Sequence, residues 1–154
     1  MRLQGKGGVM KYGTLTQAKY YHDNGKIDEW LQLFLRNDGK NLALADGLLL
    51  EEREYLGLIK LNMSYFKNVK AGTPEYLTQE NDIEYFFWIV DHMKSDFGNW
   101  DVPPLIVEFR DDDFHVNDGR HRLEMYRQMG IEEVNVVLWT TGDENKEKLQ
   151  AILD

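Results

Sequence analysis

The sequence predicts an α+β fold in which a small mixed sheet, placed mainly in the second half of the chain, is flanked by helices. Apolar residues recur at helical spacing within residues 27–35 and 83–93. Short runs rich in β-branched residues occupy residues 105–109 and 134–139, as in buried strands. The chain has 154 residues, which is enough for one domain with a moderate core and too few for two independent ones.

The first half of the chain is expected to be helical. Residues 14–21 form a candidate short helix, because Thr14 can act as its N-cap and Gln17 completes a capping box. A second helix follows, with apolar residues at positions i, i+3, i+4, i+7 and i+8: Ile27, Trp30, Leu31, Phe34 and Leu35. A helical pair of this kind usually serves as core or lid.

Two further expectations complete the N-terminal part. Gly39 stands where a helix C-terminus would place a left-handed residue, and a third helix is expected over residues 42–55. Residues 1–9 are rich in Gly and basic residues and precede a second methionine, Met10, so we expect them to be disordered or non-native. Residues 1–57 are therefore expected to form a helical extension.

Residues 58–154 are expected to form the main domain. Its best-signalled helix is capped by Asn81, with Glu84 closing a capping box, and ends at Gly98. Pro103 and Pro104 stiffen the approach to the next strand. The remaining expected elements are an extended segment at residues 58–63, a loop at 67–74, strands at 105–109, 114–117 and 134–139, a helix at 120–128 closed by Gly130, and a last helix capped by Asp143.

Composition excludes several classes of function. The absence of cysteine rules out disulfides, thiolate catalysis and zinc–thiolate sites, and it fits a cytoplasmic chain. The net charge of −9 repels nucleic-acid phosphates, so DNA is not an expected partner. No apolar run approaches the roughly 20 residues of a membrane span, and we expect neither a signal peptide nor a membrane partner.

The candidate site is the turn between an expected strand and an expected helix, Asn117-Asp118-Gly119-Arg120-His121-Arg122. The first turn of a helix exposes N–H groups without intrahelical partners, and its dipole favours a negative charge. Three basic residues here oppose that dipole unless an anion lies beside them. The pattern predicts phosphate binding through backbone N–H groups and the Arg or His side chains.

Other roles for these residues remain open from spacing alone. Arg120 and Arg122 could instead pair with surface carboxylates such as Asp112 or Glu124. Asp118 could be a general base or a ligand of a nucleotide-bound Mg²⁺, and it could equally cap the helix that starts at Gly119.

His115, Asp118 and His121 have the chemistry of metal ligands but lack a fixed i, i+4 histidine pair, so no protein-held metal is expected. Neither a Walker-type loop nor a Rossmann glycine pattern is present.

Four parts of the second half form a recognisable set: Pro103-Pro104-Leu105-Ile106-Val107, Phe114-His115-Val116-Asn117-Asp118-Gly119-Arg120-His121-Arg122-Leu123-Glu124, Gly130-Ile131 and residues 134–139. Together they resemble the ParB/sulfiredoxin superfamily, which includes the ADP-dependent free serine kinase. It covers the second half of the chain well and residues 58–98 loosely. It implies a ParB/sulfiredoxin-like domain over residues 58–154.

The resemblance also implies a role for the turn. The serine kinase carries an Asp-Gly-any-His-Arg pattern that grips nucleotide phosphates, and Asp118, Gly119, His121 and Arg122 match it. Arg120 stands where sulfiredoxin has its cysteine, so sulfiredoxin chemistry is excluded. Only residues 140–154 follow the last strand, too few for the DNA-binding domain of partitioning ParB proteins.

We therefore expect a protein that binds phosphates or nucleotides, such as Mg-ATP or Mg-ADP, with phosphotransfer as the reaction. Asn117, Gly119, Arg120, His121 and Arg122 would bind phosphate, with Asp118 and His121 as catalytic residues. One alternative is a non-catalytic nucleotide-responsive or protein-interaction module. A third is a ParB-like nuclease or DNA-binding protein. The oligomeric state and the substrate are not predicted.

Overall fold

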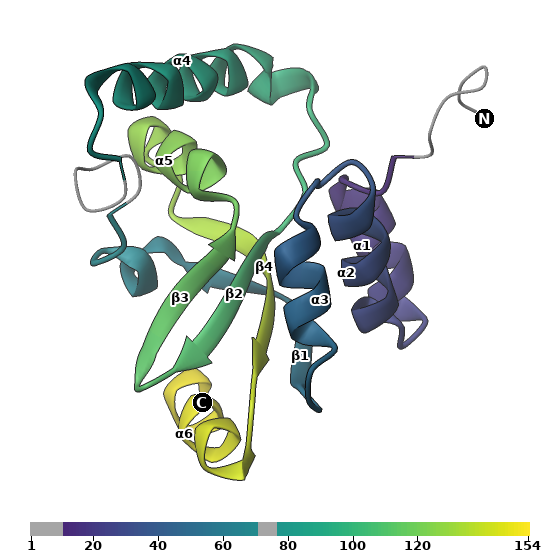
Figure 1. Cartoon of the computed structure of the whole chain (residues 1–154). Helices are drawn as coiled ribbons and strands as arrows, with labels where there is room; N and C mark the ends of the chain where they lie inside the picture. The colour runs from purple at the N-terminus through teal and green to yellow at the C-terminus, as the bar shows by residue number, and fades with distance from the viewer. Residues whose placement is uncertain (1–10, 71–76) are drawn as a thin grey trace.

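A four-stranded mixed sheet lies between two layers of helices (Figure 1). The computed structural model describes residues 11–70 and 77–154, so the expectation for residues 1–9 and the end of the loop expected at 67–74 lie outside the described residues. The strands are β1 (Glu54–Asn62), β2 (Leu105–Arg110), β3 (Asp113–Asp118) and β4 (Glu133–Thr140), in the order β1-β4-β2-β3. Strand β4 pairs antiparallel with β1 and parallel with β2, and β2 pairs antiparallel with β3. The predicted α+β class is confirmed.

The N-terminal helices form one of the two layers. They are α1 (Leu15–Asp23), α2 (Ile27–Arg36) and α3 (Leu42–Leu48). All the residues of the predicted α2 stripe are buried, and they pack on Ile106, Val137 and Trp139 of the sheet. Thr14 caps α1 as predicted, since its hydroxyl accepts a hydrogen bond from the Gln17 N–H at 3.0 Å. This layer therefore belongs to the core, and the boundary expected at residues 57 and 58 falls inside β1.

The region after α2 differs from the prediction in two places. The third helix ends at Leu48 instead of residue 55, because Arg53 donates hydrogen bonds to the carbonyls of Gly47 and Leu48 at its end. Gly39 does not adopt a left-handed conformation; Lys40 does, with φ of 50°. Gly39 is needed for another reason, since a Cβ there would lie 2.8 Å from the Phe34 carbonyl oxygen.

The second layer contains α4 (Glu80–Asp96), α5 (Arg120–Met129) and α6 (Asp143–Leu153), together with the 3-10 turns η1 (Met63–Phe66) and η2 (Phe97–Asn99). It packs on the opposite side chains of the same strands, such as Leu105, Val107, Val136 and Leu138. Two predicted caps are wrong, because α4 already begins at Glu80, before Asn81, and Asp143 is the first residue of α6, after the N-cap Gly142. In the described part of the chain, no helix combines the length and the apolar character that crossing a membrane requires.

Candidate functional site

The candidate site lies at the turn between β3 and α5, which contains Gly119. Gly119 has φ of 110° and ψ of 27°, in the left-handed region that favours glycine. A Cβ at this position would lie 2.7 Å from Leu105 Cδ2 and 2.9 Å from Arg122 Nη2. The strand–turn–helix arrangement predicted for residues 114–128 is thus present, and glycine is required there by both conformation and contact.

Helix α5 begins without a side-chain cap. Its N-cap residue is Gly119, no side chain accepts a hydrogen bond there, and the first turn contains no acidic residue. Helices α1 and α3 are capped by the side chains of Thr14 and Asn41. Helices α2, α4 and α6 also lack a side-chain cap, but each has acidic residues in its first turn. The interpretation of Asp118 as the cap of α5 is therefore wrong. The first turn of α5 thus contains no acidic residue of its own to complement the positive end of the helix dipole.

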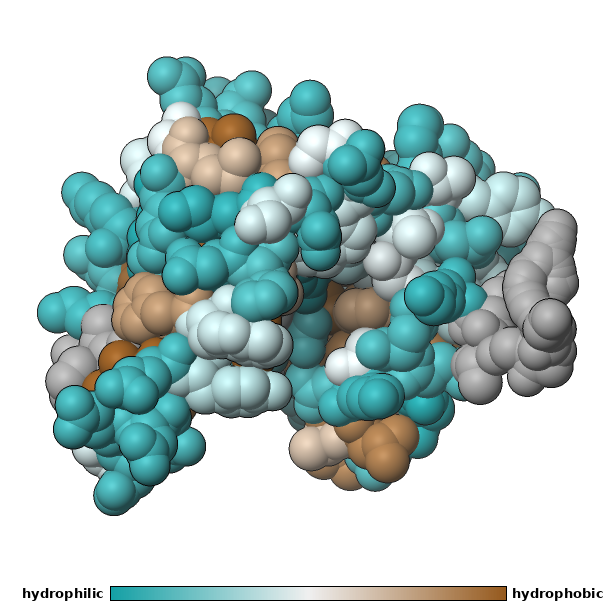
Figure 2. Space-filling view, turned by 90° about the horizontal axis from the view of Figure 1, so that it is seen from above, coloured by the Kyte–Doolittle hydropathy of each residue, from teal (hydrophilic) through white to brown (hydrophobic). Residues whose placement is uncertain are grey.

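A cavity of about 340 Å³ opens at this helix start. One wall comes from the turn and α5, and the opposite wall comes from the N-terminal layer, so residues far apart in sequence meet here. The surface seen from above is hollowed near the middle of the view (Figure 2). The lining residues are Gly13, Phe34, Asp38, Gly39, Met93, Trp100, Pro103, Asp118, Gly119, His121 and Arg122.

Arg122 is buried in the wall of the cavity and is held by protein groups. Its Nη1 donates to the carbonyl oxygens of Pro103 and Pro104, each at 2.7 Å, and its Nη2 donates to Asp118 Oδ2 at 2.8 Å. Burial lowers the pKa of Arg122, and the neighbouring Asp118 opposes that shift. The guanidinium therefore fixes the turn against the approach to β2.

Neither of the surface carboxylates considered for this arginine is its partner. Asp112 pairs with Lys148 at 3.3 Å, and Glu124 pairs with Arg127 at 3.7 Å. Its partner is Asp118, the last residue of β3, which the left-handed conformation of Gly119 brings to 2.8 Å from Arg122 on the first turn of α5.

Asp118 lies between the two helical layers. Its Oδ2 receives the hydrogen bond from Arg122, and its Oδ1 accepts a hydrogen bond from Asn41 Nδ2 at 3.1 Å. The sequence interpretation missed Asn41; a polar residue just before Leu42 could have been recognised as a helix cap, but its contact with residue 118 has no local signal. The carboxylate borders the cavity and is held in a fixed position by both partners.

His121 lies in the cavity wall with its ring stacked on Phe86, at 4.4 Å between ring centroids and 25° between planes. Burial lowers the pKa of His121 and the nearby Arg122 lowers it further, while Asp118 acts in the opposite direction. The imidazole is therefore mainly neutral at neutral pH. A neutral imidazole is suited to accept a proton rather than to serve as a permanent cation.

Two of the predicted phosphate-binding residues do not line the cavity. Asn117 Oδ1 accepts a hydrogen bond from Trp139 Nε1 at 3.0 Å, which fixes its side chain against β4. Arg120, the first residue of α5, is half-buried and also lies outside the cavity lining. His115 contacts the Arg110 carbonyl at 3.1 Å, and within residues 11–70 and 77–154 no group of three potential metal ligands is found.

The N-terminal layer contributes a carboxylate that sequence reasoning missed. Asp38 accepts hydrogen bonds from the N–H groups of Tyr12 and Gly13, at 3.0 and 2.7 Å, and lines the cavity opposite α5. A Cβ on Gly13 would lie 2.7 Å from Asp38 Oδ2, so glycine allows this close contact. Nothing in the spacing of the sequence connects residue 38 to the turn.

The lowered pKa of His121 predicts a specific pH dependence of stability. A group whose pKa is lower in the folded state binds more protons when unfolded, so its contribution to stability is lost as the pH falls below about 6.5. H121Q should therefore reduce the loss of unfolding free energy between about pH 7 and 5, measured by urea denaturation. H115Q, outside the cavity, is the matched control. An unchanged pH slope in H121Q would show that His121 is not the titrating group.

Comparisons with protein-family models, with curated proteins and with solved structures found no match for this chain.

Proposed function

We propose that this protein binds a phosphate-bearing small molecule, a Mg²⁺-nucleotide such as Mg-ATP or Mg-ADP, in the cavity at the start of α5. The observation that carries this proposal is the uncapped helix start in the cavity wall, without an acidic residue in its first turn. Backbone N–H groups at a helix N-terminus bind phosphate oxygens well, because the dipole favours a negative charge. The volume of about 340 Å³ lies within the range of small-molecule sites.

Four of the lining residues have distinct parts in this proposal. Gly119 lets the backbone approach the phosphate. The guanidinium of Arg122 is bound to protein carbonyls, so Arg122 positions the turn and is not a direct phosphate ligand in this proposal. Asp118 and Asp38 face the same cavity and are the candidates for a carboxylate ligand of nucleotide-bound Mg²⁺. We infer no metal held by the protein alone.

The reaction that fits this arrangement is phosphoryl transfer. His121, mainly neutral at neutral pH, would accept the proton of an acceptor hydroxyl as its oxygen attacks the terminal phosphorus and the shortened nucleotide leaves. Asp118 is the second candidate for this base, although its oxygens already accept hydrogen bonds from Arg122 and Asn41. The ParB/sulfiredoxin-like assignment agrees with this chemistry and belongs to the same proposal.

A protein-interaction module is less well supported. That alternative requires an exposed apolar patch on the Trp30 and Phe34 side of α2. Trp30 is 0% exposed and Phe34 is 5% exposed, and both pack in the core. A nuclease or DNA-binding role still faces the net charge of −9.

Isothermal titration with ATP, ADP and CTP, with and without Mg²⁺, tests the proposal. We expect saturable binding, together with amide NMR shifts concentrated at Gly119, His121 and Arg122. H121Q should retain binding and lose turnover by about 10²–10⁴-fold if the imidazole is the base, while H115Q should change neither. Binding without turnover in the unmodified protein would support the non-catalytic alternative. No binding at millimolar nucleotide would contradict the proposal.

A further inference from the structure

The wall of the cavity that faces the start of α5 carries the carboxylate of Asp38. Its Oδ1 accepts a hydrogen bond from the Tyr12 N–H at 3.0 Å, and its Oδ2 accepts one from the Gly13 N–H at 2.7 Å. An ionised carboxylate has about four acceptor positions. Within the described residues these two bonds are the only ones that the carboxylate makes, so each oxygen keeps an acceptor position for a ligand.

The charge of Asp38 does not require a cation beside it. Hydrogen bonds from backbone N–H groups to a carboxylate are strong and stabilise the ionised form. Among the described lining residues the one Lys or Arg is Arg122, whose guanidinium is bound to the proline carbonyls and Asp118. The wall at Asp38 is therefore negative, while the positive end of the helix dipole lies at Gly119. A phosphate fits the turn, and the part of the ligand that reaches Asp38 has to donate hydrogen bonds.

Two glycines leave the space around Asp38 open. A Cβ on Gly13 would lie 2.7 Å from both Asp38 Oδ2 and Phe34 Cε1, and a Cβ on Gly39 would lie 3.0 Å from Phe34 Cε1. The Phe34 ring stacks on Trp30, with 4.9 Å between centroids and 7° between planes, so its position is fixed. This wall thus combines an apolar ring edge with a carboxylate that has free acceptor positions. A sugar ring has the matching chemistry, since it presents C–H groups and hydroxyl donors side by side.

Contacts between the two helical layers fix this wall relative to the turn. Asn41 Nδ2 donates to Asp118 Oδ1 at 3.1 Å. The Thr16 N–H, at the start of α1, lies 3.3 Å from each carboxylate oxygen of Asp101, which belongs to the segment between α4 and β2. The carboxylate of Asp38 is therefore held at a set distance from Gly119, as selection among ligands by their functional groups requires.

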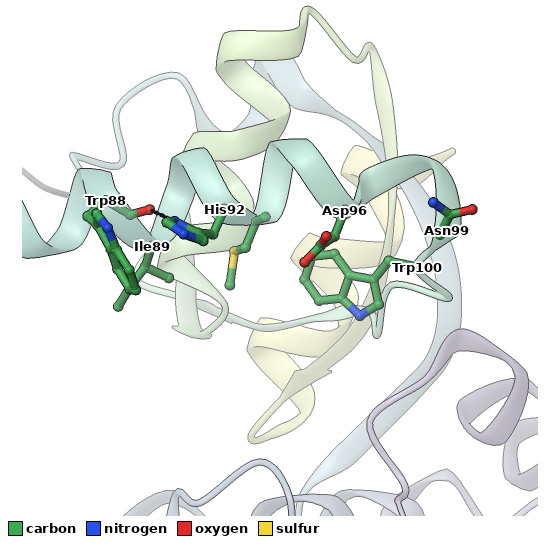
Figure 3. Close-up of a pocket in the computed structure, with 7 residues that line it drawn as sticks. Trp88, Ile89, His92, Asp96, Asn99 and Trp100 are labelled. Carbon is green, nitrogen blue, oxygen red and sulfur yellow. Dashed lines mark hydrogen bonds between the residues drawn. The ribbon is translucent and has the colours of Figure 1, made fainter.

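The size of the cavity limits which part of a nucleotide can reach Asp38. Its volume of about 340 Å³ lies near the lower end of the range of small-molecule sites. The cavity can hold the phosphates and the adjoining sugar, with the base beyond them. Met93 and Trp100 also line a second cavity, of about 500 Å³ along α4, and Figure 3 shows the Trp100 indole near the C-terminal end of that helix. The two cavities therefore adjoin, which leaves room for the base.

We propose that Asp38 binds the ribose 2′- and 3′-hydroxyl groups of the nucleotide and makes the cavity selective for ribonucleotides over deoxyribonucleotides. This inference rests on the proposed nucleotide site. Each hydroxyl donates to the unused position of one Asp38 oxygen, while the phosphates bind at the start of α5. Asp118, which adjoins Gly119, is then the carboxylate that remains for nucleotide-bound Mg²⁺. Asp38 is a specificity-determining residue and takes no part in the transfer of the phosphoryl group.

Isothermal titration of the full chain with ADP, 2′-deoxy-ADP and 2′,3′-dideoxy-ADP, each with Mg²⁺, tests this selectivity. We expect the loss of each hydroxyl to weaken binding by about 10-fold, as for a hydrogen bond to a charged acceptor. Equal affinities for the three nucleotides would overturn the inference and leave the proposed nucleotide site intact. If none of them binds, the proposed function itself fails, and this inference fails with it.

The variant D38N shows whether Asp38 causes the preference for ribose. Asparagine keeps the size of the side chain but removes its charge, and a hydrogen bond to a neutral acceptor is weaker than one to a carboxylate. The preference for ADP over 2′,3′-dideoxy-ADP should therefore fall by about 5-fold or more. Both ligands are compared on the same variant, so a general loss of stability cannot produce this change.

D46N is the matched control, because Asp46 is an exposed acid of α3 outside the cavity lining. It should keep the full preference for ribose. A preference that persists unchanged in D38N would overturn the inference. So would an equal loss of affinity for ADP and 2′,3′-dideoxy-ADP that occurs only with Mg²⁺, because Asp38 would then be a ligand of the metal and not of the sugar.

Discussion

R122M should destabilise the protein by about 3 kcal/mol, toward the lower end of the roughly 3–5 kcal/mol found when one partner of a buried ion pair is removed. Methionine retains an unbranched apolar side chain in place of the aliphatic part of Arg122. It removes the N–H groups that donate to the Pro103 and Pro104 carbonyls and to the Asp118 carboxylate. The Asp118 carboxylate borders the cavity, so water can reach it and reduce the cost. Urea denaturation of the variant and the unmodified protein measures the difference in unfolding free energy.

A double-mutant cycle separates the ion pair from the rest of the contact. D118N removes the charge of the partner, so R122M should cost less in the D118N background than alone. The loss of stability that R122M still causes in the D118N background comes from the carbonyls of Pro103 and Pro104, which lose their donor in either background. R122K gives an independent check, because an ammonium cannot reproduce the planar fork that reaches all three acceptors. A loss below about 1 kcal/mol in R122M would show that this guanidinium does not hold the turn.

The helices and strands with a clear period were predicted well from the sequence. The α2 stripe is buried as expected, because apolar residues that recur with a period of 3.6 lie on one face of a helix, and this face has to pack against the core to remove Trp30 and Leu31 from water. The boundary of α3 was missed because Leu49 and Leu50 continue the apolar pattern but are exposed. Strand β1 then begins at Glu54, which pairs with Thr140 of β4, a partner that local sequence cannot identify.

A cavity lies at the turn that the sequence indicated, but the contacts of the basic residues in this turn differ from the prediction. Consecutive residues on a helix point about 100° apart, so Arg120, His121 and Arg122 cannot all face one cavity. The structure directs Arg122 inward to Asp118 and the proline carbonyls, and places His121 against Phe86. Residues that meet the turn from elsewhere, such as Asp38, depend on the packing of the N-terminal layer and have no signal at the turn itself.

The meeting of the two layers also defines what the cavity can accept. Asn41 caps α3 through its Oδ1 and donates a hydrogen bond to Asp118 through its Nδ2. This one side chain therefore connects the start of α3 to the turn before α5. Because the opposite wall includes Phe34 and Asp38, the N-terminal layer limits the size and charge of any ligand held at Gly119. Selectivity among ligands is therefore expected to depend on this layer as much as on the turn.

G119A should be strongly destabilising, by more than the roughly 1–3 kcal/mol that an unfavourable backbone conformation costs alone. The backbone at Gly119 has φ of 110°, and the added Cβ would lie 2.7 Å from Leu105 Cδ2 and 2.9 Å from Arg122 Nη2. Leu105 is fully buried in the sheet, and the Arg122 guanidinium is fixed by its three acceptors, so neither neighbour can move cheaply. Chemical denaturation measures the loss of stability.

Gly130, at the other end of α5, provides the matched control. Gly130 also has a positive φ, of 68°, but a Cβ there would meet nothing within 4 Å. G130A therefore reports the backbone cost with little contact cost, about 1–2 kcal/mol, and the excess loss in G119A measures the close approach of Arg122 and Leu105. Equal losses in the two variants would mean that the turn can relax around a methyl group. In that case the tight fit between Gly119 and the buried guanidinium would not explain why this turn contains glycine.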